Sequence, residues 1–308
     1  MTPTDDQSAP TTTLACRRCG ASATSAVLHA VDRNRAAGDR SFEYARCDAC
    51  GVTWLPDVPE DLAAYYPDDY HASLAPADLA AAIKGEAPRL ELITRHVSPG
   101  RMLEIGPSQG VFAAAARAAG FDVVTLEMDA DCCEYLEREV GVRAIQTPAP
   151  ERVIPTLEPS RAAVMWHVIE HVPEPWAILR AIALNLEPGG VLALATPNPK
   201  SLQSRLLGAR WVHLDAPRHL TLIPLPALRD EAASLGLELV SATTSDPTGL
   251  MLNRLGWERS FLRAPAMRPN PRLAHTIGRI CKAALGEWEQ RGLRGAAYTT
   301  VFRKLQAG

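Results

Sequence analysis

The pattern that most constrains the fold begins at Arg101, where apolar strand-like segments alternate with helical ones as far as Pro197. "RMLEIG" precedes the alanine-rich "GVFAAAARAAG", and "FDVVTLEMD" precedes "ADCCEYLEREVG". "VRAIQ", "RAAVMWHV" and "GGVLALATP" supply three further strands, the last two separated by the helical "EPWAILRAIALNL". Such alternation indicates a parallel sheet covered by helices on both faces. Because "LELVSATT" and "AAYTTVFRK" predict two more strands, we expect a doubly wound, mostly parallel α/β sheet of seven strands.

The chain is predicted to have four parts. Residues 1–13 are polar and indicate a disordered leader, and residues 14–56 contain four cysteines. Residues 57–98 form an aromatic, proline-broken linker and an amphipathic helical segment. Residues 99–308 form the α/β domain, with an insertion at about 198–225 where the alternation loosens.

Composition argues against several classes of protein. The formal net charge of −3 gives no general attraction to nucleic acid or anionic lipid, although the segment from Phe261 onward is basic. No apolar run approaches the roughly 20 residues of a spanning helix, and the start lacks the basic and apolar regions of a signal peptide. We therefore expect a cytoplasmic protein without a membrane segment. The sequence gives no indication of its oligomeric state.

Four of the seven cysteines form two Cys-x-x-Cys-Gly pairs, Cys16 with Cys19 and Cys47 with Cys50. Tetrahedral zinc takes four soft ligands, and the tight turn of each pair directs two thiolates to one point. No disulfide framework is apparent, which fits a reducing compartment. The pattern predicts a zinc ribbon with a structural Zn²⁺; four sulfur ligands leave no position for a catalytic water. The alternative is a redox pair, which does not require a second pair.

The turn in "MLEIGPSQG" leads from the first predicted strand into a helix. Such a loop presents backbone N–H groups and the positive end of the helix dipole to a ligand. A dinucleotide site requires Gly-x-Gly-x-x-Gly, but Gly106 is followed by Pro-Ser-Gln-Gly-Val, so that fingerprint fails. The remaining interpretations are another ligand or a plain strand-to-helix turn.

The same stretch resembles the first motif of class I S-adenosylmethionine-dependent methyltransferases, Glu/Asp-x-Gly-x-Gly-x-Gly. Glu104, Gly106 and Gly110 match it, and Ser108 stands where the middle glycine is usual. "LEPGG", similar to the Pro-Gly-Gly turn before the fifth strand of that family, and "ATPNP" extend the resemblance to about Pro226. The resemblance implies that the loop cradles the methionine part of the cofactor. The cofactor's carboxylate suits loop amides, and its ammonium and sulfonium suit Glu104.

Glu127 ends the second predicted strand about twenty residues after the first glycine, where an acid accepts hydrogen bonds from both ribose hydroxyls. This spacing supports a nucleoside without naming the cofactor; the alternative is a solvated carboxylate at a strand end. Met128 is expected to lie against the adenine. Many relatives have an acidic residue after the third strand that bonds the adenine amino group, and here Gln146 or Thr147 would have to serve.

"MWHVIEHVPEP" follows the fourth predicted strand, at the edge where ligands of such sheets bind. Zinc-ribbon sugar-nucleotide C-methyltransferases resemble this chain in the ribbon, the tyrosine-rich linker and a Glu-His pair at this place. The resemblance implies that Glu170 and His171 deprotonate the substrate. His171 is the expected general base because imidazole titrates near neutral pH, and the alternative is a histidine that caps the next helix. His167 either approaches the cofactor or packs.

Two further groups are candidates for contact with the substrate. Tyr65, Tyr66 and Tyr70 in the linker resemble an aromatic cluster from which one tyrosine reaches the active site. We choose Tyr70, with interdomain packing as the alternative. In the insertion, Arg218 and His219 either meet an anionic substrate group, such as a nucleotide phosphate, or form structural hydrogen bonds.

These residues predict methyl transfer to a hydroxyl or activated carbon of a small molecule, such as a sugar or another biosynthetic intermediate. A hydroxyl or C–H acceptor needs a base, whereas a neutral amine needs only desolvation. One alternative is an RNA methyltransferase that uses the ribbon and the basic tail. Another is a non-catalytic S-adenosylmethionine-binding interaction protein, and a nicotinamide oxidoreductase is a more distant one. The acceptor itself is not identified by the sequence.

Overall fold

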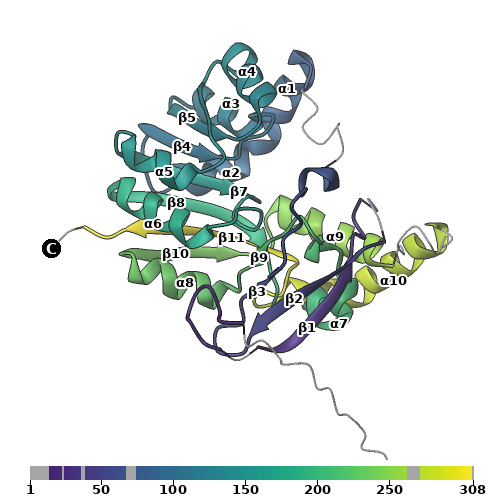
Figure 1. Cartoon of the computed structure of the whole chain (residues 1–308). Coiled ribbons are helices and arrows are strands. Elements are labelled where there is room, and N and C mark those ends of the chain that lie inside the picture. The colour runs from purple at the N-terminus through teal and green to yellow at the C-terminus, as the bar shows by residue number, and fades with distance from the viewer. Residues whose placement is uncertain (1–13, 23, 36–38, 67–73, 262–270, 307–308) are drawn as a thin grey trace, which may run out of the picture.

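Figure 1 shows a computed structural model of the chain, which describes residues 14–22, 24–35, 39–66, 74–261 and 271–306. Within these residues the strands form two sheets, a large one of seven strands and a small one of four. The strands of the large sheet are β4 (Arg101–Ile105), β5 (Asp122–Glu127), β6 (Arg143–Gln146), β7 (Ser160–Trp166), β8 (Leu186–Pro197), β10 (Leu237–Thr243) and β11 (Ala297–Lys304). Those of the small sheet are β1 (Thr24–Val31), β2 (Ser41–Cys47), β3 (Thr53–Trp54) and β9 (Thr221–Leu222).

Helices connect and cover the strands. The α-helices are α1 (Pro76–Ile83), α2 (Ala87–Thr94), α3 (Val111–Ala118), α4 (Ala130–Tyr135), α5 (Pro150–Val153), α6 (Pro175–Asn185), α7 (Leu202–Leu207), α8 (Leu225–Ser234), α9 (Pro247–Ser260) and α10 (Pro271–Gln290). The 3₁₀ turns are η1 (Ala63–Tyr65), η2 (Lys84–Glu86), η4 (Ile154–Thr156), η5 (Gly208–Arg210) and η6 (Val212–Leu214), and η3 (Leu136–Val140) is a π-helical turn. No helix in the described part of the chain is both long and apolar enough to span a bilayer.

The large sheet confirms the predicted doubly wound, mostly parallel architecture. Its order is β10-β11-β8-β7-β4-β5-β6, and β11 runs antiparallel to both of its neighbours. Because β4 pairs in parallel with β5 on one side and β7 on the other, the chain proceeds in opposite directions from β4. In sheets of this kind, ligands bind outside the carboxyl ends of the strands at the point where the connections diverge in this way.

One boundary differs from the prediction. The sequence predicts that "LEPGG" forms a turn before the fifth predicted strand, which is β8 in the structure. Instead, β8 already begins at Leu186, which pairs with Ser160 of β7. The register then shifts, so that Ala162 pairs with Val191 and residues 187–190 form an irregularity within the strand. Gly189, one of these unpaired residues, has φ +80°, a conformation that glycine adopts without steric cost.

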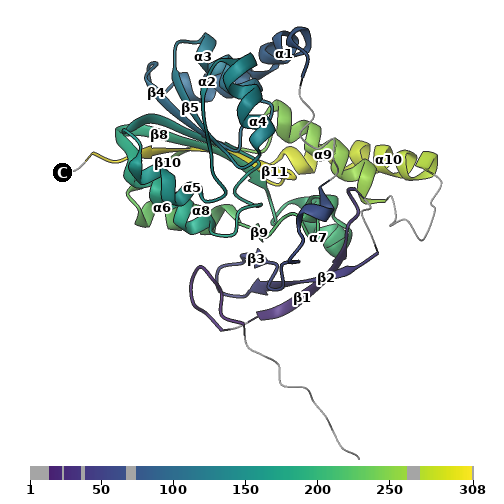
Figure 2. The same cartoon turned by 45° about the horizontal axis from the view of Figure 1, so that its top comes forward.

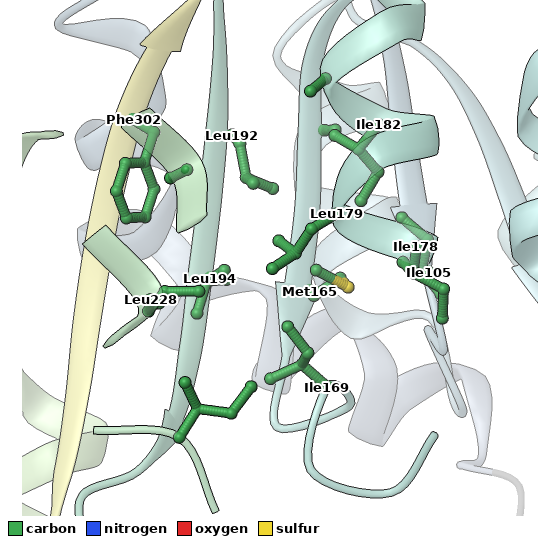
Figure 3. Packing of buried hydrophobic residues seen from close by; sticks show 14 of the residues in the cluster. Ile105, Met165, Ile169, Ile178, Leu179, Ile182, Leu192, Leu194, Leu228 and Phe302 are labelled. Atoms are coloured by element: carbon green, nitrogen blue, oxygen red, sulfur yellow. The ribbon is translucent and has the colours of Figure 1, made fainter. Parts of the chain in front are cut away.

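Two layers of helices bury opposite faces of the large sheet (Figure 2). Helices α5, α6 and α8 cover one face, and α1 to α4 cover the other. On the first face, Leu179 and Ile182 of α6 pack against Leu192 and Leu194 of β8 (Figure 3). All four side chains are completely buried, as expected for a parallel sheet with apolar strands.

The small sheet joins distant parts of the chain. Strands β1, β2 and β3 come from the N-terminal cysteine-containing segment, and β9 comes from the insertion near Pro226. Trp54 of β3 pairs with Thr221 of β9, and an apolar cluster that includes Tyr44 and Trp211 fills the space between the two segments. The N-terminal segment and the insertion therefore form one packed unit (Figure 1).

His213 connects this unit to α9. Its Nε2 lies 2.9 Å from the carbonyl oxygen of Leu252, and burial lowers the pKa of His213 from 6.5 to about 4. The folded protein consequently takes up this proton at a lower pH than the unfolded chain does. Between pH 6.5 and 4 the unfolded state binds more protons, so the stability associated with His213 decreases as the pH falls.

We expect the His213→Gln variant, which keeps a neutral N–H donor, to lose less stability than the wild type between pH 7 and pH 5. The difference should be about 1–2 kcal/mol, because the folded pKa lies well below the unfolded one. Urea unfolding at the two pH values measures it. The exposed His29→Gln variant is the control and should follow the wild type. Equal losses in wild type and His213→Gln would contradict the assignment.

Candidate functional site

The loop after β4 is held in a tight conformation by its glycines. Gly106, Ser108 and Gly110 all have positive φ angles, of +64°, +50° and +66°. A Cβ added to Gly106 would lie 2.7 Å from a methyl carbon of Val168, so a larger residue does not fit between this loop and the loop after β7. Ser108 adopts a conformation that favours glycine, which explains why glycine is usual at that position.

Glu104 lies beneath this loop with an unsatisfied oxygen. The side chain is buried, and its Oε2 has no hydrogen-bond partner among the described residues. Burial raises the pKa of Glu104 to about 8; repulsion from Glu86 adds to this effect and Arg89 opposes it. A buried carboxylate oxygen without a partner is costly. An ammonium group bound here would supply the missing donor and favour the charged form.

Arg89 of α2 is a candidate that the sequence did not indicate. Its Nη2 donates to the Thr248 hydroxyl at 3.1 Å, its Nη1 donates to the Glu86 carboxylate, and its guanidinium carbon lies 4.9 Å from the centroid of the Trp166 ring. A cation and the acid Glu104 therefore lie close to one another at the carboxyl end of the sheet. This pair matches the carboxylate and ammonium of an amino acid. Arg89 precedes the motif and reaches this place only by the packing of α2, so no local pattern reveals it.

Glu127 is organised by backbone amides. Its Oε2 accepts from the N–H of Ser108 at 3.1 Å, and its Oε1 accepts from Met128 and Asp129 at 2.7 and 3.1 Å. The carboxylate therefore joins the glycine loop to the end of β5, where a ribose is predicted to bind. Met128 remains 68% exposed, which leaves its side chain free to contact an adenine.

Gln146 and Thr147 follow β6 beside this carboxylate. Gln146 is aligned with Glu127 across the two strands, and its amide donates to the carbonyl of Met128 at 3.3 Å. Thr147 is buried and its N–H donates to the carbonyl of Glu127 at 2.7 Å. Both predicted adenine-binding residues thus lie next to the predicted ribose site, and their role there stays a prediction.

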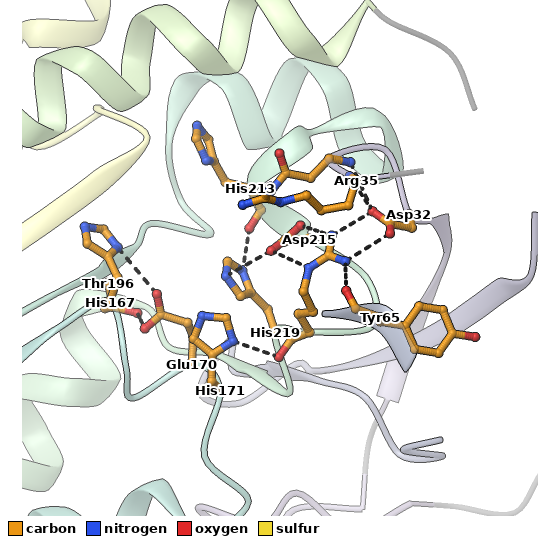
Figure 4. Close-up of polar contacts among 12 residues, drawn as sticks. Asp32, Arg35, Tyr65, His167, Glu170, His171, Thr196, His213, Asp215 and His219 are labelled. Atoms are coloured by element: carbon orange, nitrogen blue, oxygen red, sulfur yellow. Dashed lines mark hydrogen bonds and ion pairs between the residues drawn. The ribbon is translucent and has the colours of Figure 1, made fainter. Parts of the chain in front are cut away.

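Glu170 forms the buried centre of a polar cluster after β7 (Figure 4). Its side chain is fully buried; Oε2 accepts from the Thr196 hydroxyl at 2.9 Å, and Oε1 lies 3.4 Å from Nδ1 of His167. Burial by itself raises the pKa of Glu170, but His167, His171 and His219 outweigh it and lower the pKa to about 2. Glu170 is therefore a buried carboxylate beside His167, which has φ +58° just after β7.

The Nδ1 atom of His171 is in contact with two oxygen atoms. This nitrogen lies 3.1 Å from the carbonyl oxygen of Arg218 and 3.3 Å from the Tyr66 hydroxyl. The His219 ring packs edge-on against it, with ring centroids 4.6 Å apart. Burial, together with repulsion from His219, lowers the pKa of His171 to about 4. The imidazole is therefore neutral at neutral pH.

Among the residues that the structure describes, Tyr66 is the tyrosine in contact with His171. Tyr70, the predicted choice, lies outside the described residues. Tyr65 packs edge-on against Phe42 of the small sheet, and its carbonyl accepts from Arg218 at 2.7 Å. The linker thus contributes both interdomain packing and a side chain at the histidine cluster.

The Arg218 side chain is buried and paired with two carboxylates. Its side chain is completely buried between Asp32, 2.7 Å away on the small sheet side, and Asp215, also at 2.7 Å (Figure 4). Of the two alternatives for this residue, the geometry favours structural hydrogen bonding over a substrate contact. His219 is likewise engaged, since its Nδ1 lies 2.9 Å from the carbonyl of His213.

The four predicted metal ligands converge. The sulfurs of Cys16 and Cys50 are 3.6 Å apart, as are those of Cys19 and Cys47, and all four lie within 4.8 Å of one another. Tetrahedral zinc with bonds of about 2.3 Å separates its sulfur ligands by roughly 3.8 Å. The glycine after each pair has a positive φ and donates its N–H to the carbonyl of the first cysteine. The turns therefore fit a tetrahedral, thiophilic ion.

Comparison with known proteins agrees with this architecture. Residues 78–242 match the family model described as a methyltransferase domain. The ubiquinone biosynthesis O-methyltransferase of Aeromonas salmonicida is 28% identical over 125 residues, which cover 38% of this chain and 52% of that protein. The corresponding protein of Stutzerimonas stutzeri is 28% identical over 148 residues, covering 42% and 60%. The chain thus spans about half the length of the curated relatives it matches.

Two solved structures share the fold at low sequence identity. A putative sarcosine dimethylglycine methyltransferase from Galdieria sulphuraria is 16% identical, with a TM-score of 0.50 over 73% of this chain and 86% of that one. A SAM-dependent methyltransferase from Archaeoglobus fulgidus is 14% identical, with a TM-score of 0.50 over 73% and 94%. Because the family model covers more than half of the chain and the sheet order agrees with it, the chain belongs to the class I S-adenosylmethionine-dependent methyltransferases.

Proposed function

We propose that this methyltransferase transfers a methyl group to a hydroxyl or an activated carbon of a small molecule, with His171 as the general base. The observation that carries the proposal is the 3.1 Å contact between Nδ1 of His171 and the carbonyl of Arg218. A carbonyl only accepts hydrogen bonds, so Nδ1 bears the proton and Nε2 keeps its lone pair. Nε2 is then the atom that takes the proton of the acceptor.

The surroundings of His171 support proton removal. S-adenosylmethionine supplies a methyl group bonded to a sulfonium sulfur, and this sulfur leaves readily as a neutral thioether. The protein therefore mainly orients the acceptor and removes its proton. The low pKa keeps the imidazole in its basic form. Glu170 and Asp215 have pKa values lowered to about 2 and remain negative, so they stabilise the imidazolium that forms.

The cofactor is assigned to the crevice between the loops after β4 and β5. Glu104 would hold the ammonium group of the cofactor. Its carboxylate would be held by Arg89 and by the backbone amides at the start of α3, and its ribose by Glu127. The partnerless oxygen of Glu104 supports this orientation because the ammonium supplies its missing donor. The name of the matching relatives favours an oxygen acceptor, since they are called O-methyltransferases.

Replacing Glu104 with Gln should weaken the binding of adenosylhomocysteine about ten- to a hundredfold. A hydrogen bond to a charged group is worth about 1.5–3 kcal/mol, and the amide cannot attract the ammonium in the same way. Titration calorimetry gives the two dissociation constants. Glu134→Gln, at an exposed position on α4, is the control. Unchanged affinity in Glu104→Gln would remove Glu104 from the cofactor site.

Replacing His171 with Asn should reduce turnover about 10²- to 10⁴-fold, the usual contribution of a general base. Adenosylhomocysteine affinity should stay within about twofold, since the cofactor residues are not altered. The assay is adenosylhomocysteine release from S-adenosylmethionine with a panel of hydroxyl-bearing and C-acidic small molecules. His275→Asn, on the exposed side of α10, is the control. Full turnover by His171→Asn would exclude it as the base.

We also propose that Cys16, Cys19, Cys47 and Cys50 bind one structural Zn²⁺. Elemental analysis of the purified protein should give one zinc per chain, and Cys47→Ala should lose it together with thermal stability, because a structural zinc contributes directly to folding. Cys281→Ala, away from the cluster, is the control. A full equivalent of zinc retained by Cys47→Ala would contradict the assignment to the four cysteines.

A further inference from the structure

Arg218 is a fully buried cation that holds three segments of the chain together. Its Nη2 and Nη1 donate to the two carboxylate oxygens of Asp32, at 2.7 and 3.0 Å. Its Nη2 and Nε donate to Asp215, at 2.7 and 3.2 Å. Its Nη1 also donates to the carbonyl of Tyr65 at 2.7 Å. The planar guanidinium is thereby fixed in position and orientation.

The partners of Arg218 come from different parts of the structure. Asp32 directly follows β1 in the small sheet, Tyr65 ends η1 in the linker, and Asp215 follows η6 in the insertion. Asp32 is itself held, because it accepts from the backbone N–H groups of Asn34 and Arg35. The N-terminal segment therefore determines where the Arg218 side chain lies.

The main chain of Arg218 faces the other way, toward the base. Its carbonyl oxygen lies 3.1 Å from Nδ1 of His171. The residue after Tyr65 is Tyr66, whose hydroxyl lies 3.3 Å from the same nitrogen. Both groups that touch Nδ1 thus belong to segments anchored on the guanidinium.

A second connection reaches the same loop. Leu55, which follows β3 of the small sheet, donates its N–H to the carbonyl of Leu220 at 2.9 Å. Leu220 and Thr221 in turn donate to the carbonyl of Glu170, at 2.7 and 3.1 Å. Backbone hydrogen bonds therefore run from the small sheet through β9 to the residue before His171.

We propose that the N-terminal segment is a positioning element for the active site, and that Asp32, through Arg218, sets the tautomer of His171. The guanidinium anchored on Asp32 holds the Arg218 carbonyl against Nδ1, and Nε2 is thereby kept as the proton acceptor. This inference rests on the proposed role of His171 as the base. Asp32 and Arg218 are positioning residues; neither touches the reacting groups.

Several charged or titratable groups face His171 and bear on any measurement of its protonation. They are Tyr66 from the linker, Glu170 from its own loop, and Asp215, Arg218 and His219 from the insertion. All five of these groups stay chemically unchanged in the Asp32→Asn variant. A change in the tautomer of His171 in that variant therefore reports the loss of the Asp32 charge.

The test is nitrogen-15 NMR of the zinc-containing, full-length protein with labelled histidine. The His171 ring signals are assigned by their absence in His171→Asn. In the wild type between pH 6 and pH 8, we expect a protonated Nδ1 and an unprotonated Nε2. In Asp32→Asn, the His171 signals should shift toward the opposite tautomer, with the adenosylhomocysteine dissociation constant unchanged. Glu43→Gln, at an exposed position on β2, is the control and should match the wild type.

Each outcome decides the inference. A wild-type His171 with its proton on Nε2 overturns it without any variant. So does an Asp32→Asn protein that binds adenosylhomocysteine and keeps the wild-type tautomer, because the ion pair is then only structural.

If Asp32→Asn does not fold, the Arg218→Lys variant replaces it, because an ammonium group cannot contact Asp32, Asp215 and the Tyr65 carbonyl at the same time. An unchanged His171 tautomer in Arg218→Lys also overturns the inference. Full turnover by His171→Asn would refute the base and leave the tautomer result intact, so the two failures are distinguishable.

Discussion

The arrangement of the site depends on the parallel pairing of β4 with both β5 and β7. The three strands run in the same direction, but the chain adds β5 on one side of β4 and later adds β7 on the other, so the connections after these strands lead to opposite sides of β4. Glu104, Glu127 and His167 lie at the ends of these strands, which are buried on both faces and therefore rigid. Side chains at the ends of packed strands are held at more precise distances than side chains on loops.

The histidine cluster shows how burial and charge pairing act together. Glu170 and Asp215 are buried carboxylates that stay ionised because imidazole rings and Arg218 surround them, and burial lowers the pKa of His171 so that its imidazole stays neutral. Such a network is costly to break, since removal of one partner leaves another charge buried and unpaired, at about 3–5 kcal/mol. A cluster of this kind is consistent with a functional site more than with stability alone.

The small sheet is packed against the segment that contacts the histidine cluster. It shares an apolar core with the insertion, and its Asp32 meets the insertion's Arg218 inside the protein. The N-terminal cysteine segment and the loop that carries His171 are thus coupled by packing, by an ion pair and by backbone hydrogen bonds. The four cysteine sulfurs of this unit lie within 4.8 Å of one another, so an ion bound to them would stabilise it.

The sequence alone determined the features that depend on local spacing. Apolar periodicity predicted the strands and helices of the α/β domain, and the two Cys-x-x-Cys-Gly pairs predicted the metal-binding turns. Glu104 and Glu127 became cofactor candidates, and His171 the base candidate, because they lie at or shortly after the ends of predicted strands. Only the tertiary structure decided that Tyr66 contacts His171, that the Arg89 guanidinium lies over the Trp166 ring, and that Arg218 is a buried anchor. Strand β9 has two residues, too few for any periodic signal, and Asp32 and Arg218 are far apart in the chain. These contacts arise from non-local packing, which no local pattern of residues encodes.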